Sequence, residues 1–578
     1  MSGQTAIQPR WVAVLVASEK GGWMLNRGLI VVGYLGFVLG IGFLARSRAR
    51  GTADDYFIAS RSLPPIVLFL TMAATNFSAF TVFGFSGAGW RIGYAFYPIM
   101  AFGTGFMALS FHVIGRPVWE LGKKNGFVTP PEFIFHRFGS TTLRLLFFSV
   151  LTVFTLPYLA MQPMAAGYAL EELLGIPYLA GAVLITAVML LYTFFGGMRG
   201  VAWTDVFQGG ALIVLLLVAL GMIAAPFGGI AAANRAAASQ APQLFSRPGM
   251  GGSLSPGIWF GYMLLWLLCD PMFPQLFQRF YAARNGRALG LTMSLYPLIT
   301  GVLFLLPVAI GVIGRLAFPT LPAETSSDKI LPLLLGRYVP PAVEALVLTA
   351  ALAALMSTLD SQLLTLSSMF TRDLMEPFSG HGAHASPWVG KLFVIGLAVV
   401  GLVIAVRPPA TFLTIATETF TGLAVLFPAV VSGLYWRGAT AKGAIASIIV
   451  GEGLVVAYHV HALPSFGTLP VIPVVLITSA VLVAVSLVTR PHPNAREPVS
   501  GSKRPRLNWK WIAIFGAVFI LGNDFWNWED ERLGPLGFPA WVWYFLGLCV
   551  ILAVLFWILA VRSDVEAETS DRGNRTKR

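Results

Sequence analysis

The sequence predicts an all-α integral membrane protein with about 15 transmembrane helices. Hydrophobic residues make up 56% of the 578 residues and charged residues 11%, with a mean hydropathy of +0.75. Such a chain has too little polar surface to cover a water-soluble globule. Apolar runs of about 20 residues recur along the whole length, and the short alternating segments of an outer-membrane barrel do not occur. The spans are therefore expected to be helices.

The N-terminal part contains one short apolar run, Trp11 to Ala17, which lacks the length of a span and a signal-peptide cleavage site. We expect residues 1–27 to form an exposed or interfacial tail. The first span, within residues 28–46, is followed at once by Arg46, Arg48 and Arg50. The positive-inside rule places these arginines in the cytoplasm and the N-terminus outside.

The remaining spans alternate from this starting point. They are predicted near residues 64–88, 93–115, 142–170, 177–195, 205–225, 257–278, 290–315, 340–371, 389–407, 411–436, 441–462, 469–489, 510–522 and 539–561. This scheme puts 28 of the 39 Lys and Arg residues inside and 11 outside, and a shift by one span would reverse the bias. It predicts a multi-pass cell-membrane protein with a cytoplasmic C-terminus. The net charge of +13 then faces lipid head groups, and no nucleic-acid partner is needed to explain it.

One predicted helix, from Ala350 to Asp373, carries small and hydroxyl residues at helical spacing. Its polar face consists of Ala354, Ser357, Thr358, Ser361, Thr365 and Ser368. Small-residue packing against a neighbouring helix would explain any single Ser or Thr there. The full row, with Asp360 and Asp373 nearby, instead indicates oxygen ligands for a hard cation such as sodium.

Two other spans contain residues that interrupt helices. The segment from Thr71 to Gly89 mixes polar residues and three glycines into an apolar run, and its middle could unwind. Unwinding frees backbone carbonyls to coordinate a cation. In the second span, Asp270 lies between Cys269 and Pro271, with a further proline at 274. A carboxylate in a membrane span is a functional candidate, unless Asp270 is hydrated near a cytoplasmic end marked by Arg279.

Six stretches carry a resemblance to a known family. They are residues 55–63 (DYFIASRSL), 73–89, 129–138 (TPPEFIFHRF), 196–208 (GGMRGVAWTDVFQ), 353–373 and 428–443. With these stretches the chain resembles the sodium:solute symporter family, whose members carry proline, pantothenate, monocarboxylates or sugars. The third-last and second-last stretches, with their Trp-Thr-Asp and Met-Ser-Thr-Leu-Asp-Ser runs, are specific as a pair.

The resemblance implies a LeuT-type fold, in which two inverted five-helix repeats surround a central site. The ten-helix core would comprise residues 50–436, with repeats at about 64–225 and 257–436. Two peripheral helices would follow at 437–490, and residues 491–578 would form an extension with two further helices and a cytoplasmic tail. The family's sodium site maps onto the carbonyls of Ala74, Phe77 and Ala354 and the hydroxyls of Ser357 and Thr358.

Two carboxylates are expected on the cytoplasmic side of this sodium site. By resemblance, Asp205 is the acidic residue near the inner end of the sodium path; alternatively, Thr204 and Asp205 cap a helix N-terminus. Asp360 lies one turn beyond Ser357 and would receive the leaving ion. The alternative is that Asp360 pairs with an inner-face arginine such as Arg372 and only fixes the position of its helix.

Five polar side chains are the best candidates to face the substrate: Asn76, Thr81, Gln162, Asp270 and Glu418. Gln162 has an alternative role, because it stands beside Pro163 and could satisfy backbone groups that this proline frees. Glu418 could instead lie at an outer water boundary. The pair of Cys269 and Asp270 with Pro274 matches no specificity that we can assign.

We expect a sodium-coupled symporter that imports a small organic solute, with a weak preference for a monocarboxylate or amino acid. An unwound helix offers a half-helix N-terminus to an anionic group, which favours a carboxylate-bearing solute. Symport of pantothenate or a sugar remains open, as does a transporter-like sensor that signals to a partner. The chain carries no P-loop, Ser-His-Asp arrangement or zinc spacing, so no enzyme is predicted. Sodium and solute are the expected partners within the lipid bilayer, no cofactor is expected, and a protein partner is unknown.

Overall fold

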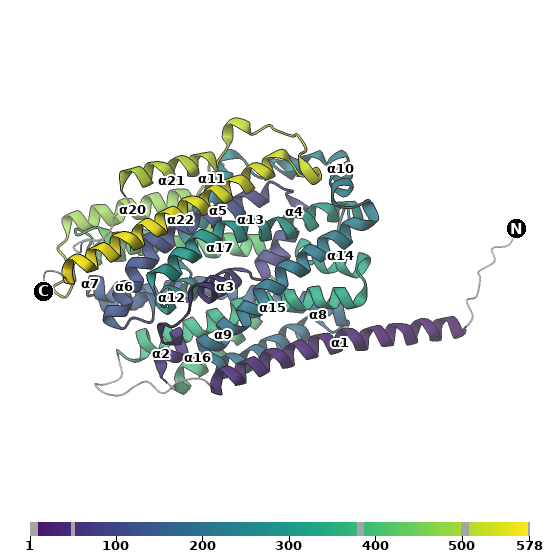
Figure 1. Cartoon of the computed structure of the whole chain (residues 1–578), viewed down its shortest axis with the longest axis horizontal. Helices are drawn as coiled ribbons and strands as arrows, with labels where there is room; N and C mark the ends of the chain where they lie inside the picture. Colours follow the sequence, from purple (N-terminus) through teal and green to yellow (C-terminus); the bar gives the residue numbers. More distant parts are fainter. Residues whose placement is uncertain (1–9, 48–51, 378–386, 499–507, 576–578) are drawn as a thin grey trace.

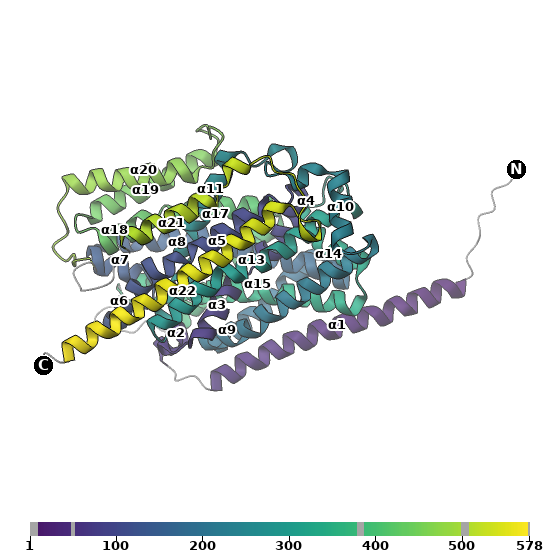
Figure 2. The ribbon, with the colours of Figure 1, turned by 45° about the horizontal axis from the view of Figure 1, so that its top comes forward.

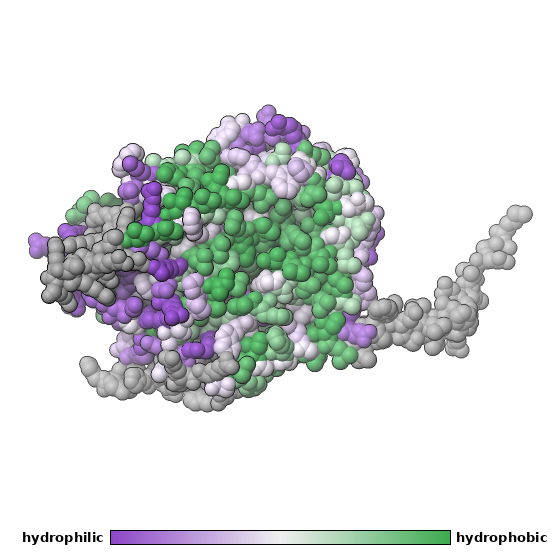
Figure 3. Space-filling view, in the orientation of Figure 1, coloured by the Kyte–Doolittle hydropathy of each residue, from purple (hydrophilic) through white to green (hydrophobic). Residues whose placement is uncertain are grey.

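The computed structural model describes residues 10–47, 52–377, 387–498 and 508–575. Over these residues the chain is helical, with isolated bridges and no sheet. The long helices run roughly side by side along one direction (Figure 1). Apolar side chains form a broad band across the face in Figure 3, and hydrophilic residues gather toward the ends. A band of this kind, crossed by long helices, is the surface that a bilayer covers.

Each predicted span has a helical counterpart. Ten helices in the described part of the chain are long and apolar enough to cross a membrane, and a bent pair, Pro65–Asn76 with Phe80–Arg91, makes an eleventh. The other four predicted spans correspond to shorter helices at Tyr178–Leu191, Pro256–Cys269, Leu392–Val406 and Trp509–Leu521. The prediction from apolar runs therefore holds, with several spans shorter than a straight crossing requires.

The first half of the core begins with a helix that breaks. Pro65–Asn76 and the segment from Phe80 meet at an angle of 60°, and Phe77 to Ala79 connect them. The helices of this half are α3 (Pro65–Asn76), η2 (Phe80–Gly84), α4 (Phe85–Arg91), α5 (Phe96–Met107), η3 (Phe111–Gly115), α6 (Arg116–Asn125), α7 (Pro130–Phe138), α8 (Thr141–Leu174) and α9 (Tyr178–Ala224). The short α2 (Ala53–Ile58) precedes them.

A glycine divides α9 into the two spans that the sequence predicts. Gly197 has φ of 52° and ψ of −163°, a conformation that residues with a β-carbon rarely adopt. A β-carbon there would also lie 2.7 Å from the carbonyl oxygen of Tyr56. The bend at Gly197 separates Tyr178–Leu191 from the long span Gly197–Phe227.

The second half of the core repeats this pattern. Its first span breaks at Asp270 to Phe273, where Pro271 and Pro274 remove two backbone donors. The helices of this half are α10 (Ile230–Gln240), α11 (Pro256–Cys269), η7 (Asp270–Met272), α12 (Pro274–Ala282), α13 (Gly286–Ala317), α14 (Ile330–Tyr338), α15 (Pro341–Met369), η9 (Phe370–Met375), α16 (Pro387–Val406), α17 (Phe412–Ala424) and α18 (Phe427–Tyr435). Each half thus starts with an interrupted helix.

The peripheral helices lie on two sides of this core (Figures 1 and 2). α1 (Arg10–Ser47) packs along α9 and α15. It begins well before residue 28, the predicted start of the first span, and no proline interrupts it between residues 10 and 47. α19 (Ala441–His459) packs against α20 (Val471–Val488). α21 (Trp509–Leu521) precedes α22 (Ala540–Arg575), which packs along α13 and α5. α20, α21 and α22 lie on the side of the core opposite α1 (Figures 1 and 2). Residues 1–9 of the predicted tail lie outside the described residues.

A buried ion pair joins the loop before α11 to the loop between α21 and α22. Arg247 is fully buried, and its guanidinium donates to the carboxylate of Asp524 at 2.5 Å and to its carbonyl oxygen at 3.0 Å. The same guanidinium donates to the carbonyl of Asn527 and lies 5.9 Å and 5.7 Å from the ring centres of Trp528 and Trp541. A charge buried so completely needs all of these partners.

Candidate functional site

Oxygens from the broken helix of the first half and from α15 meet in the core. α3 ends at Asn76, and Phe77 is extended, with φ of −86° and ψ of 93°. The Thr358 hydroxyl lies 3.0 Å from the Thr75 carbonyl oxygen and 3.4 Å from the carbonyl oxygens of Phe77 and Ala354. Four oxygen atoms from two helices therefore converge at the break, and we call them the oxygen group.

The other two expected sodium ligands adjoin this group. The Ala74 carbonyl accepts a hydrogen bond of 3.1 Å from the backbone N–H of Phe77. The Ser357 hydroxyl turns away from Thr358 and donates to the carboxylate of Asp205 at 2.5 Å. Ser357 and Asp205 are both fully buried. The sequence spacing of Ala354, Ser357 and Thr358 thus does bring these three residues to the broken helix.

Asp205 lies beside the oxygen group, in contact with Ser357. Its carboxylate accepts hydrogen bonds from Ser357 and from the hydroxyl of Thr71 in α3. The alternative of a helix cap is wrong, because α9 continues through this residue and Thr204 bonds the carbonyl of Val201 within the helix. Asp205 therefore links the first helix of the core to α15.

Arg279, counted as a cytoplasmic charge in the sequence, lies in this same cluster. It is fully buried on α12, and its guanidinium donates to Asp205 at 3.3 Å, Ser361 at 2.7 Å and Thr71 at 3.1 Å. Sequence reasoning missed it because its partners come from three other helices. A weak signal existed, since Gln278 and Arg279 follow directly on an apolar, aromatic span.

The remaining hydroxyls of the α15 face bond to α12. Thr365 donates to the side-chain oxygen of Gln278 at 2.6 Å, and the Gln278 amide donates to Ser368 at 2.8 Å. This face is therefore a polar seam between two helices. Asp360 is buried on the same helix, and its carboxylate lies 3.3 Å from the Ser361 hydroxyl.

The proposed partner of Asp360 is engaged elsewhere. Arg372 lies 3.1 Å from Glu132 and 3.6 Å from Glu376. Arg372 therefore has two carboxylate partners of its own, whereas the charge of Asp360 acts on another arginine, Arg279 of α12.

Three of the expected substrate residues bind to the protein itself at the break. Thr81 donates to the carbonyl of Asn76 at 3.1 Å, and Asn76 donates to the hydroxyl of Tyr296 at 2.9 Å. Gln162 accepts from the backbone N–H of Ala79 at 3.0 Å and donates to a carbonyl in its own helix. Gln162 therefore satisfies backbone groups, although those of the broken α3 rather than only those freed by Pro163.

Asp270 lies at the break of the second half, and it is buried rather than hydrated near a cytoplasmic end. Its side chain is 3% exposed. One carboxylate oxygen accepts a contact of 3.5 Å from the Cys269 thiol, and the other has no hydrogen-bond partner among the described residues. Of the five expected substrate residues, Asp270 alone has a fully buried side-chain oxygen without a hydrogen-bond partner in the part of the chain that the structure describes.

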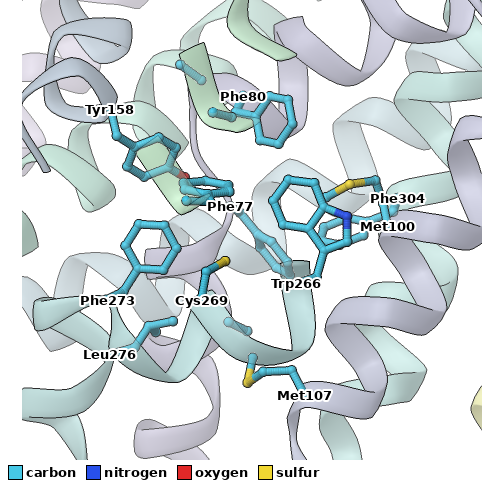
Figure 4. Close-up of a cluster of buried hydrophobic side chains, with 14 of the residues drawn as sticks. Phe77, Phe80, Met100, Met107, Tyr158, Trp266, Cys269, Phe273, Leu276 and Phe304 are labelled. Carbon is cyan, nitrogen blue, oxygen red and sulfur yellow. The ribbon is translucent and has the colours of Figure 1, made fainter. Parts of the chain in front are cut away.

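Aromatic side chains gather around Cys269, the residue that precedes Asp270 in the chain (Figure 4). The rings of Tyr158 and Phe273 are 5.3 Å apart, and Phe420 lies 5.2 Å from the first and 4.8 Å from the second. Trp266 lies 5.1 Å from Phe420, and Phe80 lies 6.0 Å from Trp266. These five rings, which we call the aromatic cluster, come from four different spans of both halves.

Glu418 does not belong to this region. Its side chain is 53% exposed, and its carboxylate lies 3.3 Å from a ring nitrogen of His459 in α19. α17 turns this residue outward, one helical turn after the exposed Thr414. The structure therefore separates Glu418 from the other candidate residues.

The C-terminal end of α4 is covered by a loop that sequence reasoning did not single out. Asp328 in this loop is buried and accepts the backbone N–H of Phe412 at 2.9 Å, while Arg91 donates to Thr411 at 3.1 Å. Burial raises the pKa of Asp328 to about 6, against the smaller lowering by the Phe412 N–H and Arg91. The loop thus joins the start of α17 to the end of the first broken span.

Two halves that each begin with a broken helix, around buried oxygens at the breaks, define a secondary transporter of the inverted-repeat class. A model of the sodium:solute symporter family matches residues 56–451. The chain belongs to this family and is a sodium-coupled symporter of the cell membrane, with sodium as its coupling ion.

Relatives with known functions agree with this assignment. The sodium/pantothenate symporter of Haemophilus influenzae is 28% identical over 446 residues, which cover 74% of this chain and 90% of that protein. A sodium/proline symporter of Staphylococcus aureus is 26% identical over 485 residues, which cover 80% of this chain and 92% of that protein.

A solved structure shows the fold. The structure of a Na⁺-coupled sialic acid symporter in a substrate-bound outward-open state superimposes with a TM-score of 0.68. It is 22% identical in sequence and covers 81% of this chain and 98% of that one. The fold is therefore of the LeuT type, as expected from the sequence motifs.

Proposed function

We propose that this protein imports a small organic solute together with sodium, by alternating access, and that sodium binds at the oxygen group. The observation that carries the proposal is the convergence of the Thr358 hydroxyl with the carbonyls of Phe77 and Ala354 within 3.4 Å. Neutral oxygens at the end of a broken helix are ligands suited to a hard monovalent cation.

The proposed ligands divide into two kinds. The carbonyls of Ala74, Phe77 and Ala354 would supply backbone oxygens, and Ser357 and Thr358 would supply hydroxyls. In the structure these hydroxyls donate hydrogen bonds to neighbouring oxygens. A sodium ion would bind the lone pairs of these hydroxyl oxygens, which would keep their protons and turn them away from the ion. Asp205 would add negative charge through Ser357.

The location of the site supplies the coupling. α3 belongs to the first half of the core and α15 to the second, so a bound ion would hold the two halves together at the break. Loss of the ion would remove this attraction and free α3 to move relative to α15. We infer that Asp205 and Asp360 lie on the path by which sodium leaves toward the cytoplasm, with the N-terminus outside and the C-terminus inside.

We infer that the solute carries a carboxylate, which is a narrower class than all the solutes that the family transports. Pantothenate and proline are the solutes in the names of the relatives, and both carry a carboxylate, in keeping with the preference from the sequence. We infer that the core, residues 50–436, carries transport, and that 437–490 and the extension 491–578 are peripheral.

The direct test uses purified protein in liposomes. An inward sodium gradient should drive accumulation of at least one labelled solute from a set that starts with pantothenate and proline. Potassium and proton gradients of the same size serve as matched controls. Equal accumulation with the controls would show that sodium is not the driving ion.

A further inference from the structure

Asp270 is a buried carboxylate that the proposed sodium mechanism does not use. It lies in η7, between two prolines, where the helix is interrupted. One of its oxygens has no hydrogen-bond partner in the described part of the chain. A buried carboxylate oxygen without a partner is costly, and a ligand that supplies a positive charge would remove that cost.

The surroundings of Asp270 show how a ligand could reach it. The Asn76 amide carries two N–H groups and lies against both the Asp270 carboxylate and the Tyr296 hydroxyl, to which it donates at 2.9 Å. From Thr71 to Gly89, a stretch that the structure describes in full, Asn76 alone is half-buried and the other residues are buried. Asn76 is therefore partly open to a water-sized probe, whereas Asp270 beside it is buried.

Aromatic rings make up the opposite side of this site. Tyr158, whose phenol is close enough to Asp270 for an electrostatic interaction, packs against the rings of Phe273 and Phe420 in tilted and edge-on contacts. Figure 4 shows Cys269, the neighbour of Asp270, facing the space between Phe273, Phe77 and Trp266. Rings around a carboxylate favour an organic cation, because ring faces attract positive charge and contact alkyl groups.

A second sodium ion fits these neighbours less well. Sodium binds through several hard oxygen ligands, and here the surrounding groups are rings, a thiol and a carboxamide that is already bonded. An ammonium group carrying carbon substituents uses both features, since the charge pairs with the carboxylate and the carbons pack on the rings.

We propose that Asp270 and the aromatic cluster bind a positively charged nitrogen of the transported solute. This inference rests on the proposed function and narrows it. The substrate is then an ammonium-bearing compound, such as an amino acid or a betaine-like zwitterion. A simple monocarboxylate is excluded, because its negative charge would meet a second buried negative charge without a cation between them.

The first test reads the charge preference of the site without knowing the substrate. Cys269 and Cys549 are the two cysteines, so Cys549→Ser leaves one thiol next to Asp270. The rate of Cys269 modification is measured with a trimethylammonium and a sulfonate methanethiosulfonate reagent, each normalised to its rate with a small free thiol. The cationic reagent should be preferred about tenfold or more.

Matched variants assign this preference. Asp270→Asn, which keeps the shape, should bring the ratio of rates close to one, and Asp270→Glu should restore part of it. Glu452→Gln removes another unpartnered carboxylate, on the peripheral α19, and should leave the ratio unchanged. Equal normalised rates in the Cys549→Ser protein, or no modification of Cys269 by either reagent, would overturn the proposal.

The second test uses pairs of ligands that differ only in the charged atom. Sodium-dependent thermal stabilisation is measured with glycine betaine against 3,3-dimethylbutanoate, and with proline against cyclopentanecarboxylate. The nitrogen member of a pair should stabilise the protein, and Asp270→Asn should weaken its apparent affinity about tenfold or more. A carbon isostere that stabilises as well as its nitrogen partner contradicts the proposal.

The experiments distinguish an error in the proposed sodium site from an error in the proposed nitrogen site at Asp270. If the oxygen group is not the sodium site, Ser357→Ala will leave the sodium dependence unchanged, while the charge preference at Cys269 persists. If Asp270 does not bind the nitrogen, the charge preference disappears from the parent protein while sodium dependence remains.

Discussion

The oxygen group and the Asp270 region both lie at breaks in core helices, but their polar atoms differ in how completely they are hydrogen-bonded. Around Asp205, hydroxyls, a carboxylate and the Arg279 guanidinium bond to one another. Around Asp270, rings surround a carboxylate with an unused oxygen. A region whose polar atoms are already paired can select a small ion by geometry. A region with an unpaired charge needs a ligand of opposite charge to complete it, and there we propose that the substrate binds.

The largest expected effect tests whether the oxygen side is one closed network. Arg279→Met would leave the buried Asp205 without its cation, which should destabilise the protein by about 3–5 kcal/mol. Thermal unfolding in detergent measures this loss. The double variant with Asp205→Asn should recover much of it, because the uncompensated charge is then gone. Additive losses in the double variant would show that the two residues do not form a unit.

A second prediction concerns the ligands themselves. Ser357→Ala and Thr358→Ala each remove one oxygen, so the sodium concentration for half-maximal uptake should rise about tenfold or more. Sodium dependence of uptake in liposomes measures this shift. Ser149→Ala is the matched control, because its hydroxyl bonds within its own helix on the exposed side of α8. Unchanged sodium dependence in both site variants would place sodium elsewhere.

A smaller effect is expected at Asp360. Asp360→Asn removes a buried charge beside Ser361, on the proposed exit from the site. Turnover should fall by up to about tenfold while equilibrium sodium binding changes less, because the charge would lower the barrier for a leaving ion. Comparison of the uptake rate with sodium-dependent thermal stabilisation separates the two. A variant that fails to fold, or that turns over normally, supports a structural role instead.

The smallest effect is expected from acidification of the outer face. In its hydrogen bonding Asp328 resembles both regions, since one carboxylate oxygen accepts from the Phe412 N–H and the other has no partner among the described residues. Its pKa is about 6 in the closed loop and should return to about 3.8 when the loop opens and is hydrated. The closed form alone takes up a proton between these values. Lowering the pH from 7 to 5 should therefore favour closure and slow uptake a few-fold.

Asp328→Asn provides the comparison for this pH effect. The variant has no titrating group in the loop, so its uptake should lose the dependence between pH 5 and 7. Uptake that slows equally in the variant would assign the pH effect to another group.

The contrast also explains what could be predicted from the sequence. The spans follow from apolar runs, and the face of α15 follows from spacing at i, i+3 and i+4, both of which are local properties. The break at Asp270 follows from its two prolines, whereas the break from Phe77 to Ala79 contains neither glycine nor proline and lies before the glycines of its span. Arg279 could not be placed, because a charge at the end of an apolar run is buried only if other helices bring partners to it. Glu418 was expected inside although Thr414 and Glu418, one turn apart, share an exposed face of α17.

The buried pair of Arg247 and Asp524 sets an order on the synthesis of the chain. Arg247 leaves the ribosome some 277 residues before its partner carboxylate. Until the loop between α21 and α22 is made, the Arg247 guanidinium lacks its carboxylate partner and must stay hydrated. The core can insert helix by helix from its N-terminus, but the loop before α11 reaches its final position last. A chain that stops before residue 508 would contain the whole proposed transport core, but Arg247 would have no carboxylate partner.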